Sequence, residues 1–401
     1  MAEAEAAYRR LPRKGLPEAG REWSVAAAFV AGRADGTGLH TVALATGNKC
    51  VGGTAARAAT AGDVVLDGHA EVLARRALRR LLLDDARRLR TGDGTAVILE
   101  WCDEHTRTAM RMRDDAAVLH LVVSAPPCGD AAVYCTATGE DKTEDEEPEA
   151  KRARTDAWTG LHVTGARRTT DGERVSVWDE AGAAEGAVVL GACRAKPGRG
   201  DPTQSMSCSD KIAMWACTGL QGALVGTLLE RPLVLDTVVV CGGQATAPET
   251  LSAMQAAAVR ALVDRVGTLA VGHTTVTVLQ HSFAGVAERA DTLRAAGAGV
   301  VWHGGGFHEV VLTHMGKKLG TTKAKFNSPA NCSGVAKRCL FDLYLKANSA
   351  TATQEGEEEH RMTYAEAKQS NTAYFATKQQ VKEQTLKNWI PKLPSLEAFH
   401  L

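Results

Sequence analysis

The pattern of hydrophobic and polar positions alternates between short apolar runs and longer stretches with helical spacing. The apolar runs have the length of strands and occur at Trp23–Val30, Leu39–Leu44, Val97–Trp101, Val118–Ser124, Val234–Val240 and Thr274–Leu279. Apolar residues spaced three and four apart predict a helix from His69 to about Arg90 and another over residues 249–266. We therefore expect strands and helices to alternate along the chain.

Three further helices are predicted outside this alternating region. The Ala/Glu-rich beginning predicts a short helix before Pro12. The segment Met206–Lys211 opens a helix to about Leu229, and a C-terminal helix is expected from about Tyr364 to Lys387.

Two charged segments, at residues 139–157 and 348–360, interrupt this pattern. Their composition is typical of solvated, disordered insertions. The tetrad Lys151-Arg152-Ala153-Arg154 fits a nuclear-import patch, but such patches are nonspecific and a charged loop is the favoured interpretation. We expect a single domain over residues 1–401 that carries both insertions.

The composition of the chain agrees with this prediction of a single α/β domain and adds little to it. Lys plus Arg and Asp plus Glu each number 47, so net charge does not indicate a polyanionic partner. The chain has no apolar run of about 18 residues and no signal-peptide core at its Arg-rich start. Its ten irregularly spaced cysteines fit thiols and metal ligands better than a disulfide framework. We expect no membrane association and a cytoplasmic or nuclear location, or both.

The tripeptide His69-Ala70-Glu71 opens the long predicted helix. A histidine at a helix start can offer a ring nitrogen to Zn²⁺, and a glutamate two residues later can move protons for a metal-bound water without binding the metal. This H-x-E pattern is the first half of the signature of zinc nucleobase deaminases. Because the tripeptide also occurs by chance in helices, its meaning depends on cysteines further along.

Cys128 and Cys208 are the cysteines best placed to supply metal-binding thiolates. Each follows an extended stretch and stands where a helix is expected to begin, so free backbone N–H groups favour the anionic sulfur. The other cysteines fit buried, inert thiols better, and Cys135 lies too far along the chain to share a metal with Cys128. With His69 they make three ligands and an open fourth position for water, whereas a structural zinc site needs four ligands.

Three segments together resemble the catalytic domain shared by adenosine deaminases acting on RNA and tRNA-specific adenosine deaminases. They are H-A-E-V-L-A-R-R, P-P-C-G-D-A and S-M-S-C-S-D-K-I-A-M-W, with their ligand positions separated by 59 and 80 residues. T-G-N-K-C-V-G and K-P-G-R-G-D-P-T are similar to the tRNA branch of the family. The resemblance spans nearly the whole chain and is patchy at 139–190 and 281–360.

The resemblance implies an α/β, cytidine-deaminase-like fold with a mixed central sheet, flanking helices and a C-terminal helical extension. His69, Cys128 and Cys208 would bind Zn²⁺. A metal-activated water would attack carbon 6 of a flipped-out adenine, and Glu71 would protonate the leaving ammonia, so that adenosine becomes inosine. In the tRNA branch the substrate is the adenosine immediately 3′ of the anticodon in alanine tRNA.

The resemblance also implies inositol hexakisphosphate buried near the zinc. The side chains expected around it are cationic or aromatic: Arg75, Arg76, Lys211, Trp215, Lys337, Tyr364, Lys368, Tyr374, Lys378, Trp389 and Lys392. Asp67, with Lys211, would link the polyphosphate to the metal centre. Judged without the resemblance, the C-terminal Tyr/Lys pattern also fits a solvated amphipathic helix. Leu66, Met214 and Ala223 stand where the family usually has polar or cationic residues, which predicts weaker or altered polyphosphate binding.

Contacts with RNA are expected at two places. Asn48 and Lys49 lie on a Gly-bearing loop before the His69 helix, where a lysine either touches substrate or points to solvent. Residues 317–346 carry seven Lys/Arg and one Asp, a net charge of +6 (7 − 1), which fits a phosphate-backbone footprint. Lys337 fits either this footprint or the polyphosphate site.

Two other functions stay open on the sequence. One is a deaminase that acts on another RNA or on a free nucleotide, although a free nucleotide would not need the basic 317–346 segment. The other is a non-catalytic RNA-binding protein, which would require loss of the proton-moving glutamate, and Glu71 is present.

Overall fold

The computed structural model describes most of the chain, namely residues 1–59, 61–136, 161–170, 173–176, 188–198, 200–349 and 362–401. The predicted insertion at 139–157 lies outside these residues. So does most of the predicted break at 348–360, although the preceding helix continues through Ser349.

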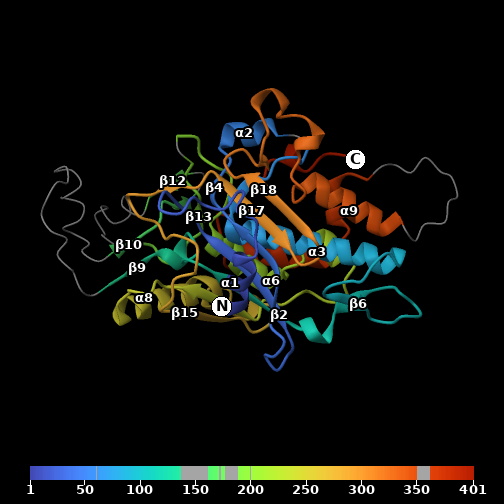
Figure 1. The fold of residues 1–401 in the computed structure, drawn as a ribbon, viewed down its shortest axis with the longest axis horizontal. Helices are drawn as coiled ribbons and strands as arrows, with labels where there is room; N and C mark the ends of the chain where they lie inside the picture. Colours follow the sequence, from blue (N-terminus) through green and yellow to red (C-terminus); the bar gives the residue numbers. More distant parts are fainter. Residues whose placement is uncertain (60, 137–160, 171–172, 177–187, 199, 350–361) are drawn as a thin grey trace, which may run out of the picture.

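An eight-stranded mixed sheet crosses the molecule in the order β15-β14-β8-β2-β3-β17-β18-β19 (Figure 1). Its strands are β2 (Ala26–Gly32), β3 (His40–Thr46), β8 (Val118–Val123), β14 (Thr237–Cys241), β15 (Thr275–Leu279), β17 (Ala298–His303), β18 (Phe307–Leu312) and β19 (Lys317–Lys318). β8, β14 and β15 run parallel, and the remaining neighbours are antiparallel. The expectation of an α/β protein with a mixed central sheet and flanking helices is confirmed.

Strand β2 shows how helices cover both faces of the sheet. All seven of its residues are buried. Ala26, Ala28 and Val30 belong to the apolar cluster that contains helix α1 (Ala2–Arg9), and the alternate residues belong to the cluster of helix α3 (Ala70–Thr91). Side chains alternate between the faces of a strand, so an almost unbroken apolar run predicts burial on both.

The other elements surround this sheet. The remaining helices are α2 (Gly53–Ala58), α6 (Cys208–Thr218), α7 (Gly222–Gly226), α8 (Pro248–Val259), α9 (Lys337–Ser349), α10 (Tyr364–Gln369) and α11 (Thr372–Gln384). The short strands are β1 (Glu22–Trp23), β4 (Asn48–Cys50), β5 (Asp67–His69), β6 (Leu99–Trp101), β7 (Met110–Met112), β9 (Tyr134–Cys135), β10 (Leu161–His162), β11 (Arg167–Thr170), β12 (Glu173–Val175), β13 (Arg194–Ala195) and β16 (Arg294–Ala295).

Two predicted helices are shorter than expected. The helix predicted to reach Leu229 ends at Thr218, because Gly219 adopts φ 79° and turns the chain before α7. The single helix predicted from Tyr364 to Lys387 is instead α10 and α11. The break lies at Asn371, whose side chain accepts the backbone N–H of Tyr374 at 3.0 Å and caps α11.

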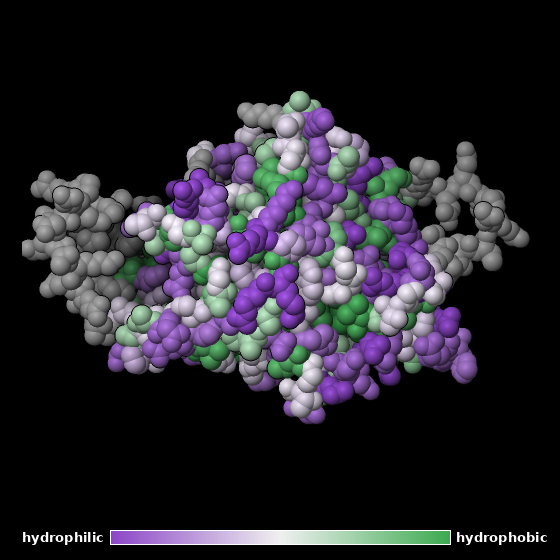
Figure 2. All heavy atoms as spheres, in the orientation of Figure 1, coloured by the Kyte–Doolittle hydropathy of each residue, from purple (hydrophilic) through white to green (hydrophobic). Residues whose placement is uncertain are grey.

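Strands β17 and β18 were not predicted from the sequence. They form an antiparallel pair that extends the sheet beyond β3. In the part of the chain that the structure describes, no helix has the length and hydropathy to span a bilayer. On the face drawn in Figure 2, hydrophobic residues lie in small patches separated by hydrophilic ones.

Candidate active site

His69 is held at the junction between a two-stranded ribbon and helix α3. β4 and β5 pair antiparallel, with Asn48 opposite His69. The N–H of Ala70 donates to the carbonyl of Gly47 at 3.0 Å, which fixes the start of the helix. A side chain at Gly47 would lie 2.0 Å from the carbonyl oxygen of Gly68, so this close approach requires glycine. The imidazole therefore projects from a rigid helix start.

Cys128 lies on the loop that follows β8. The sequence predicted a helix here, and this is wrong: a single 3₁₀ turn, Asp130–Ala132, follows the cysteine. The intervening Gly129 adopts φ 106° and ψ −145°, a conformation that is essentially restricted to glycine. A Cβ atom at Gly129 would lie 2.2 Å from Ser207 Oγ, so glycine also lets this loop reach the start of α6.

Cys208 is the first residue of α6, as predicted. Ser207 caps the helix, since its Oγ accepts the N–H of Asp210 at 3.2 Å and donates to the Asp210 carboxylate at 2.5 Å. The N–H of Cys208 donates to Cys128 Sγ at 3.4 Å. The helix N-terminus therefore favours negative charge on the Cys128 sulfur.

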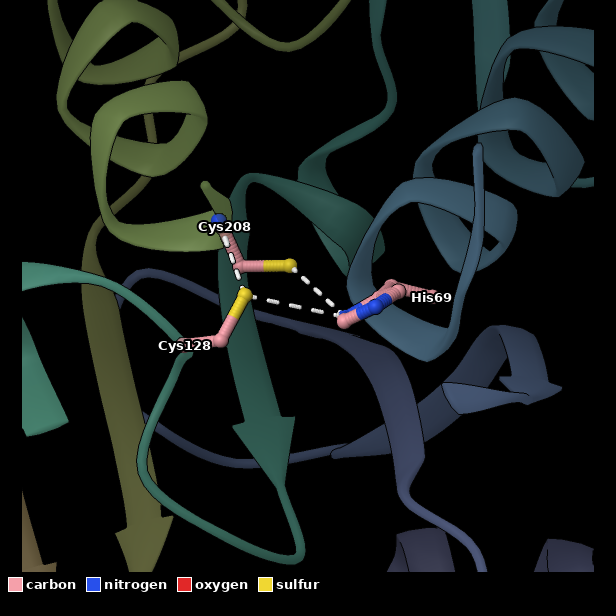
Figure 3. A group of neighbouring side chains, drawn as sticks. All are labelled: His69, Cys128 and Cys208. Carbon is pink, nitrogen blue, oxygen red and sulfur yellow. Dashed lines mark hydrogen bonds between the residues drawn. The ribbon is translucent and has the colours of Figure 1, made fainter. Parts of the chain in front are cut away.

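The structure brings these three side chains together, and they point toward one another (Figure 3). His69 Nδ1 lies 3.7 Å from Cys128 Sγ and 3.6 Å from Cys208 Sγ. The nitrogen and both sulfurs lie within 4.8 Å of one another. One imidazole and two thiols fit the donor set of a catalytic zinc site, with a fourth position for water.

Glu71 lies in the first turn of α3 and is 2% exposed. Among the described residues its Oε2 atom has no hydrogen-bond partner, although it is buried. Burial raises the pKa of this carboxyl, which prepares it to carry a proton. A residue that moves protons needs a carboxylate oxygen that is available to substrate and water, and an unpartnered buried oxygen beside the metal ligands meets this need.

A buried ion-pair network supports the ligand shell. Lys196 Nζ lies 2.9 and 2.8 Å from the two Asp67 carboxylate oxygens and 3.2 Å from Cys208 Sγ. Asp67 also accepts a hydrogen bond from Lys211 and the backbone N–H of His69. Burial opposes ionisation of Asp67, but the two lysines hold its pKa well below the usual range. Lys196 was not predicted, because Lys-Pro-Gly-Arg-Gly gives no local sign of a contact with Cys208.

The two cysteine thiols share their charge unequally. The hydrogen bond from Cys208, with help from Lys196 and His69, holds the pKa of Cys128 well below its usual range. Burial raises the pKa of Cys208 well above its usual range, and the neighbouring Cys128 raises it further. A bound dication would favour the thiolate form of both residues, because zinc binds thiolates.

A second set of charged side chains forms what we call the basic cluster: Arg75, Arg76, Arg79, Lys337, Lys368, Lys378 and Lys392, with Tyr364 and Tyr374. Its shared carboxylate is Glu397, whose oxygens lie 2.9 Å from Lys337, 2.5 Å from Lys368 and 3.7 Å from Lys392. Burial opposes the charge on Glu397, but these lysines hold its pKa far below the usual range. Arg79 and Glu397 were not predicted.

The pKa of Tyr374 reflects the surplus of positive charge in the basic cluster. Burial would raise its pKa, yet Arg75 and Lys378 outweigh burial and lower the pKa to about 8. Burial lowers the pKa of Arg75 to about 10. The basic cluster therefore has the electrostatics of a site that takes a polyanion.

Two of the predicted polyphosphate residues make other contacts, one of them the expected contact of Lys211 with Asp67. Lys211 contacts Asp67, and Trp389 packs against the apolar cluster that contains Val381. Trp215 lies beside the basic cluster, with the Arg75 guanidinium 4.8 Å from its ring centroid.

The three residues that depart from the family pattern lie in or beside apolar surroundings. Met214 is buried with Val381 and Leu386, Leu66 packs beside Leu396, and Ala223 is buried. None of these three side chains offers a charge to the basic cluster.

Asn48 and Lys49, the predicted RNA contacts, lie next to the metal ligands. The Asn48 side-chain amide donates to the carbonyl of Trp23 at 3.0 Å, and its Oδ1 is buried without a partner among the described residues. Lys49 Nζ donates to the carbonyl of Ala295 at 2.8 Å. The structure thus gives Lys49 a structural contact beside the site.

The predicted basic footprint at 317–346 is wrong in part. Lys317 is fully buried, and its Nζ lies 2.5 Å from Asp63. Lys337 is also buried and pairs with Glu397. These two side chains are buried and paired with carboxylates inside the protein, so they do not face an RNA backbone.

Comparison with known proteins identifies the family of the chain. Residues 43–393 match the family described as the adenosine-deaminase (editase) domain. The chain is 28% identical to tRNA-specific adenosine deaminase 1 of Drosophila melanogaster, over 98% of this chain and 94% of that protein. It is 28% identical to the Homo sapiens protein of the same name, over 97% and 96%. It is 29% identical to the double-stranded RNA-specific adenosine deaminase of Mus musculus, over 49% of this chain and 15% of that protein. The chain therefore belongs to the adenosine-deaminase (editase) domain family and is an adenosine deaminase.

Proposed function

We propose that this protein deaminates an adenosine of tRNA to inosine at a zinc centre formed by His69, Cys128 and Cys208. The observation that carries the proposal is the convergence of these three donors beside a buried, unpartnered Glu71 carboxylate. Nearly full-length similarity to tRNA-specific adenosine deaminases supports tRNA as the substrate. The position that we propose is the adenosine immediately 3′ of the anticodon of alanine tRNA.

Each residue has a distinct part in the proposed reaction. Bound zinc would supply the acidity that activates water for attack on carbon 6 of the purine. Glu71 takes a proton from that water and delivers it to the departing amino nitrogen, and its raised pKa suits both transfers. Lys196 contacts both Asp67 and the sulfur of Cys208, and these contacts hold the metal ligands in place.

We also propose that the mixed sheet and its flanking helices form a cytidine-deaminase-like fold. In that fold we place the metal-binding loop of Cys128 after β8 and the metal-binding histidine at the start of α3, which packs across the sheet.

We further propose that inositol hexakisphosphate occupies the basic cluster. A set of cations that share one carboxylate needs additional negative charge, and a polyphosphate supplies several charges at once. Native mass spectrometry of purified protein is expected to show a retained polyphosphate. A folded, active protein of the mass of the bare chain plus zinc would contradict this part of the proposal.

The function is tested by measuring inosine in three RNAs after incubation with zinc-loaded protein. They are an unmodified alanine tRNA transcript, the same transcript with guanosine in place of the target adenosine, and a long RNA duplex. We expect inosine in the first RNA alone. Inosine in the duplex and none in the tRNA would overturn the proposal and favour a deaminase that acts on another RNA.

A further inference from the structure

A cavity of about 270 Å³ lies beside the candidate active site, at the carboxyl ends of β8 and β14. Its walls include Trp23, Ser124 and Pro126 on one side and Met254 of α8 on the other. Nothing in the proposed reaction uses this cavity.

The cavity adjoins the metal ligands through two of its walls. Pro126 is two residues before Cys128 on the same loop. The carbonyl of Trp23 accepts the side-chain amide of Asn48 at 3.0 Å, and Asn48 lies opposite His69 in the β4–β5 ribbon. RNA whose target adenosine enters the active site would therefore pass close to this cavity.

Aromatic rings supply flat surfaces in the lining. Tyr134 and His162 stack with ring centroids 4.5 Å apart and planes at 6°. His162 Nδ1 lies 3.1 Å from the carbonyl of Ala132, so the ring donates from Nδ1 and leaves Nε2 as an acceptor. Trp23 offers a third aromatic ring.

The lining of the cavity carries few charged side chains. Among the lining residues, Arg289 is the one guanidinium or ammonium group and Glu288 is the one carboxylate. Arg289 is exposed, and its guanidinium lies 6.0 Å from the Trp23 ring centroid. Several phosphates would need more cations than this, whereas one base and its adjoining phosphate need an aromatic surface and one cation.

Size favours the same ligand. Pockets for drug-sized molecules measure roughly 300–1,000 Å³, so a cavity of about 270 Å³ suits one nucleobase. A target adenosine must leave its stack before deamination, which also frees its neighbours from stacking on it.

We propose that this cavity, given the proposed function, binds an unpaired nucleobase that flanks the target adenosine. Trp23 stacks on the base, and Arg289 contacts the adjoining phosphate. The cavity therefore contributes to the choice of substrate by requiring a flanking nucleotide whose base can unstack from its neighbours.

The test combines Trp23→Ala with RNAs that each lack one base. The deamination rate is measured on intact tRNA and on transcripts with a single abasic site at each nucleotide flanking the target. Stacking on an aromatic side chain contributes about 1–3 kcal/mol per base, so Trp23→Ala is expected to slow deamination of intact RNA roughly 5- to 150-fold. On the transcript that lacks the bound base, the deamination rate of the wild-type protein is expected to fall by a similar factor. Trp23→Ala is expected to lower the rate on that transcript no further.

Trp23→Phe is the matched control, because it retains a stacking ring and is expected to keep most of the rate on intact RNA. An equal effect of Trp23→Ala on every abasic transcript, or no effect at all, would overturn the inference. If wild-type protein makes no inosine in intact tRNA, the proposed function fails, and the inference falls with it. If the protein forms inosine in intact tRNA but no single abasic transcript abolishes the effect of Trp23→Ala, the proposed role of the cavity is refuted and the proposed function is not.

Discussion

Among the single residues near the metal ligands, Gly129 connects two of them. It follows Cys128, and its Cα faces Ser207, which caps the helix that begins with Cys208. Any side chain at this position is opposed twice, by a backbone conformation that disfavours L residues and by the Ser207 hydroxyl. The spacing of the two sulfurs therefore depends on a residue that does not bind the metal.

Gly129→Ala is expected to lose several kcal/mol of stability, of which about 1–3 kcal/mol comes from the backbone alone. It should also lower the zinc content per chain. Gly36→Ala is the control, since Gly36 has φ 80° but open space around its Cα. Equal losses of unfolding free energy in the two variants, with zinc retained in both, would show that the approach of the loop to α6 is unimportant.

The site residues differ in how far the sequence could reveal them. Cys208 follows the capping residue Ser207, and His69 stands at the start of a long helical pattern, so both could be found locally. Lys196 and Glu397 could not, because their importance comes from partners more than ten residues away: Asp67 and Cys208 for the first, and Lys337 with Lys368 for the second.

At the scale of elements, helix α1 is fixed to the sheet by more than its apolar face. Glu5 accepts the N–H of Ala284 at 2.9 Å and lies 2.7 Å from His281 Nε2. Burial would raise the pKa of Glu5, but the Ala284 N–H and the His281 ring outweigh it and lower the pKa. The carboxylate thus ties α1 to the loop after β15.

Glu5→Gln is expected to cost about 1–2 kcal/mol of unfolding free energy at pH 7, since a charge-assisted contact is lost. Because the folded protein lowers the pKa of Glu5 below its ordinary 4.5, this contribution is complete above pH 4.5 and is lost as pH falls through the folded value. Denaturant titrations of wild type and Glu5→Gln should therefore converge at low pH. The exposed Glu3→Gln is the control, and a constant difference at all pH values would refute the tether.

Element predictions succeeded where one signal dominated. The apolar periodicity of α3 gave that helix nearly at its observed bounds, and the apolar run predicted as a strand over Trp23–Val30 contains most of β2, Ala26–Gly32. The C-terminal helix was predicted as one piece because its Tyr/Lys spacing masked the cap at Asn371, a signal that was present in the sequence. The end of α6 at Gly219 was signalled in the same way, by a glycine within a helical pattern.

At the scale of the whole molecule, Glu397 joins segments far apart in the chain. It pairs with Lys337 at the start of α9 and Lys368 of α10. The basic cluster therefore holds the C-terminal part against the α3 side of the core, and its electrostatic balance affects folding as well as any bound anion.

Glu397→Gln is expected to lower the free energy of unfolding by about 3–5 kcal/mol without polyphosphate, because it leaves buried lysines uncompensated. Added inositol hexakisphosphate should raise the thermal midpoint of this variant more than that of wild type. Asp342→Asn, which removes an exposed pair with Lys346, is the control. A midpoint equal to that of the control, with no response to the polyphosphate, would contradict the role of Glu397.

In the proposed reaction, Glu71 moves protons at a zinc centre that does not need this residue to bind the metal. The most direct measurement is the rate of inosine formation in alanine tRNA by Glu71→Gln protein that carries one zinc per chain, beside Glu249→Gln as an exposed first-turn control. We predict normal zinc content and tRNA affinity with a rate at least about 10²–10⁴-fold below wild type. A zinc-loaded Glu71→Gln protein that forms inosine at close to the wild-type rate would show that Glu71 is not the proton-moving residue.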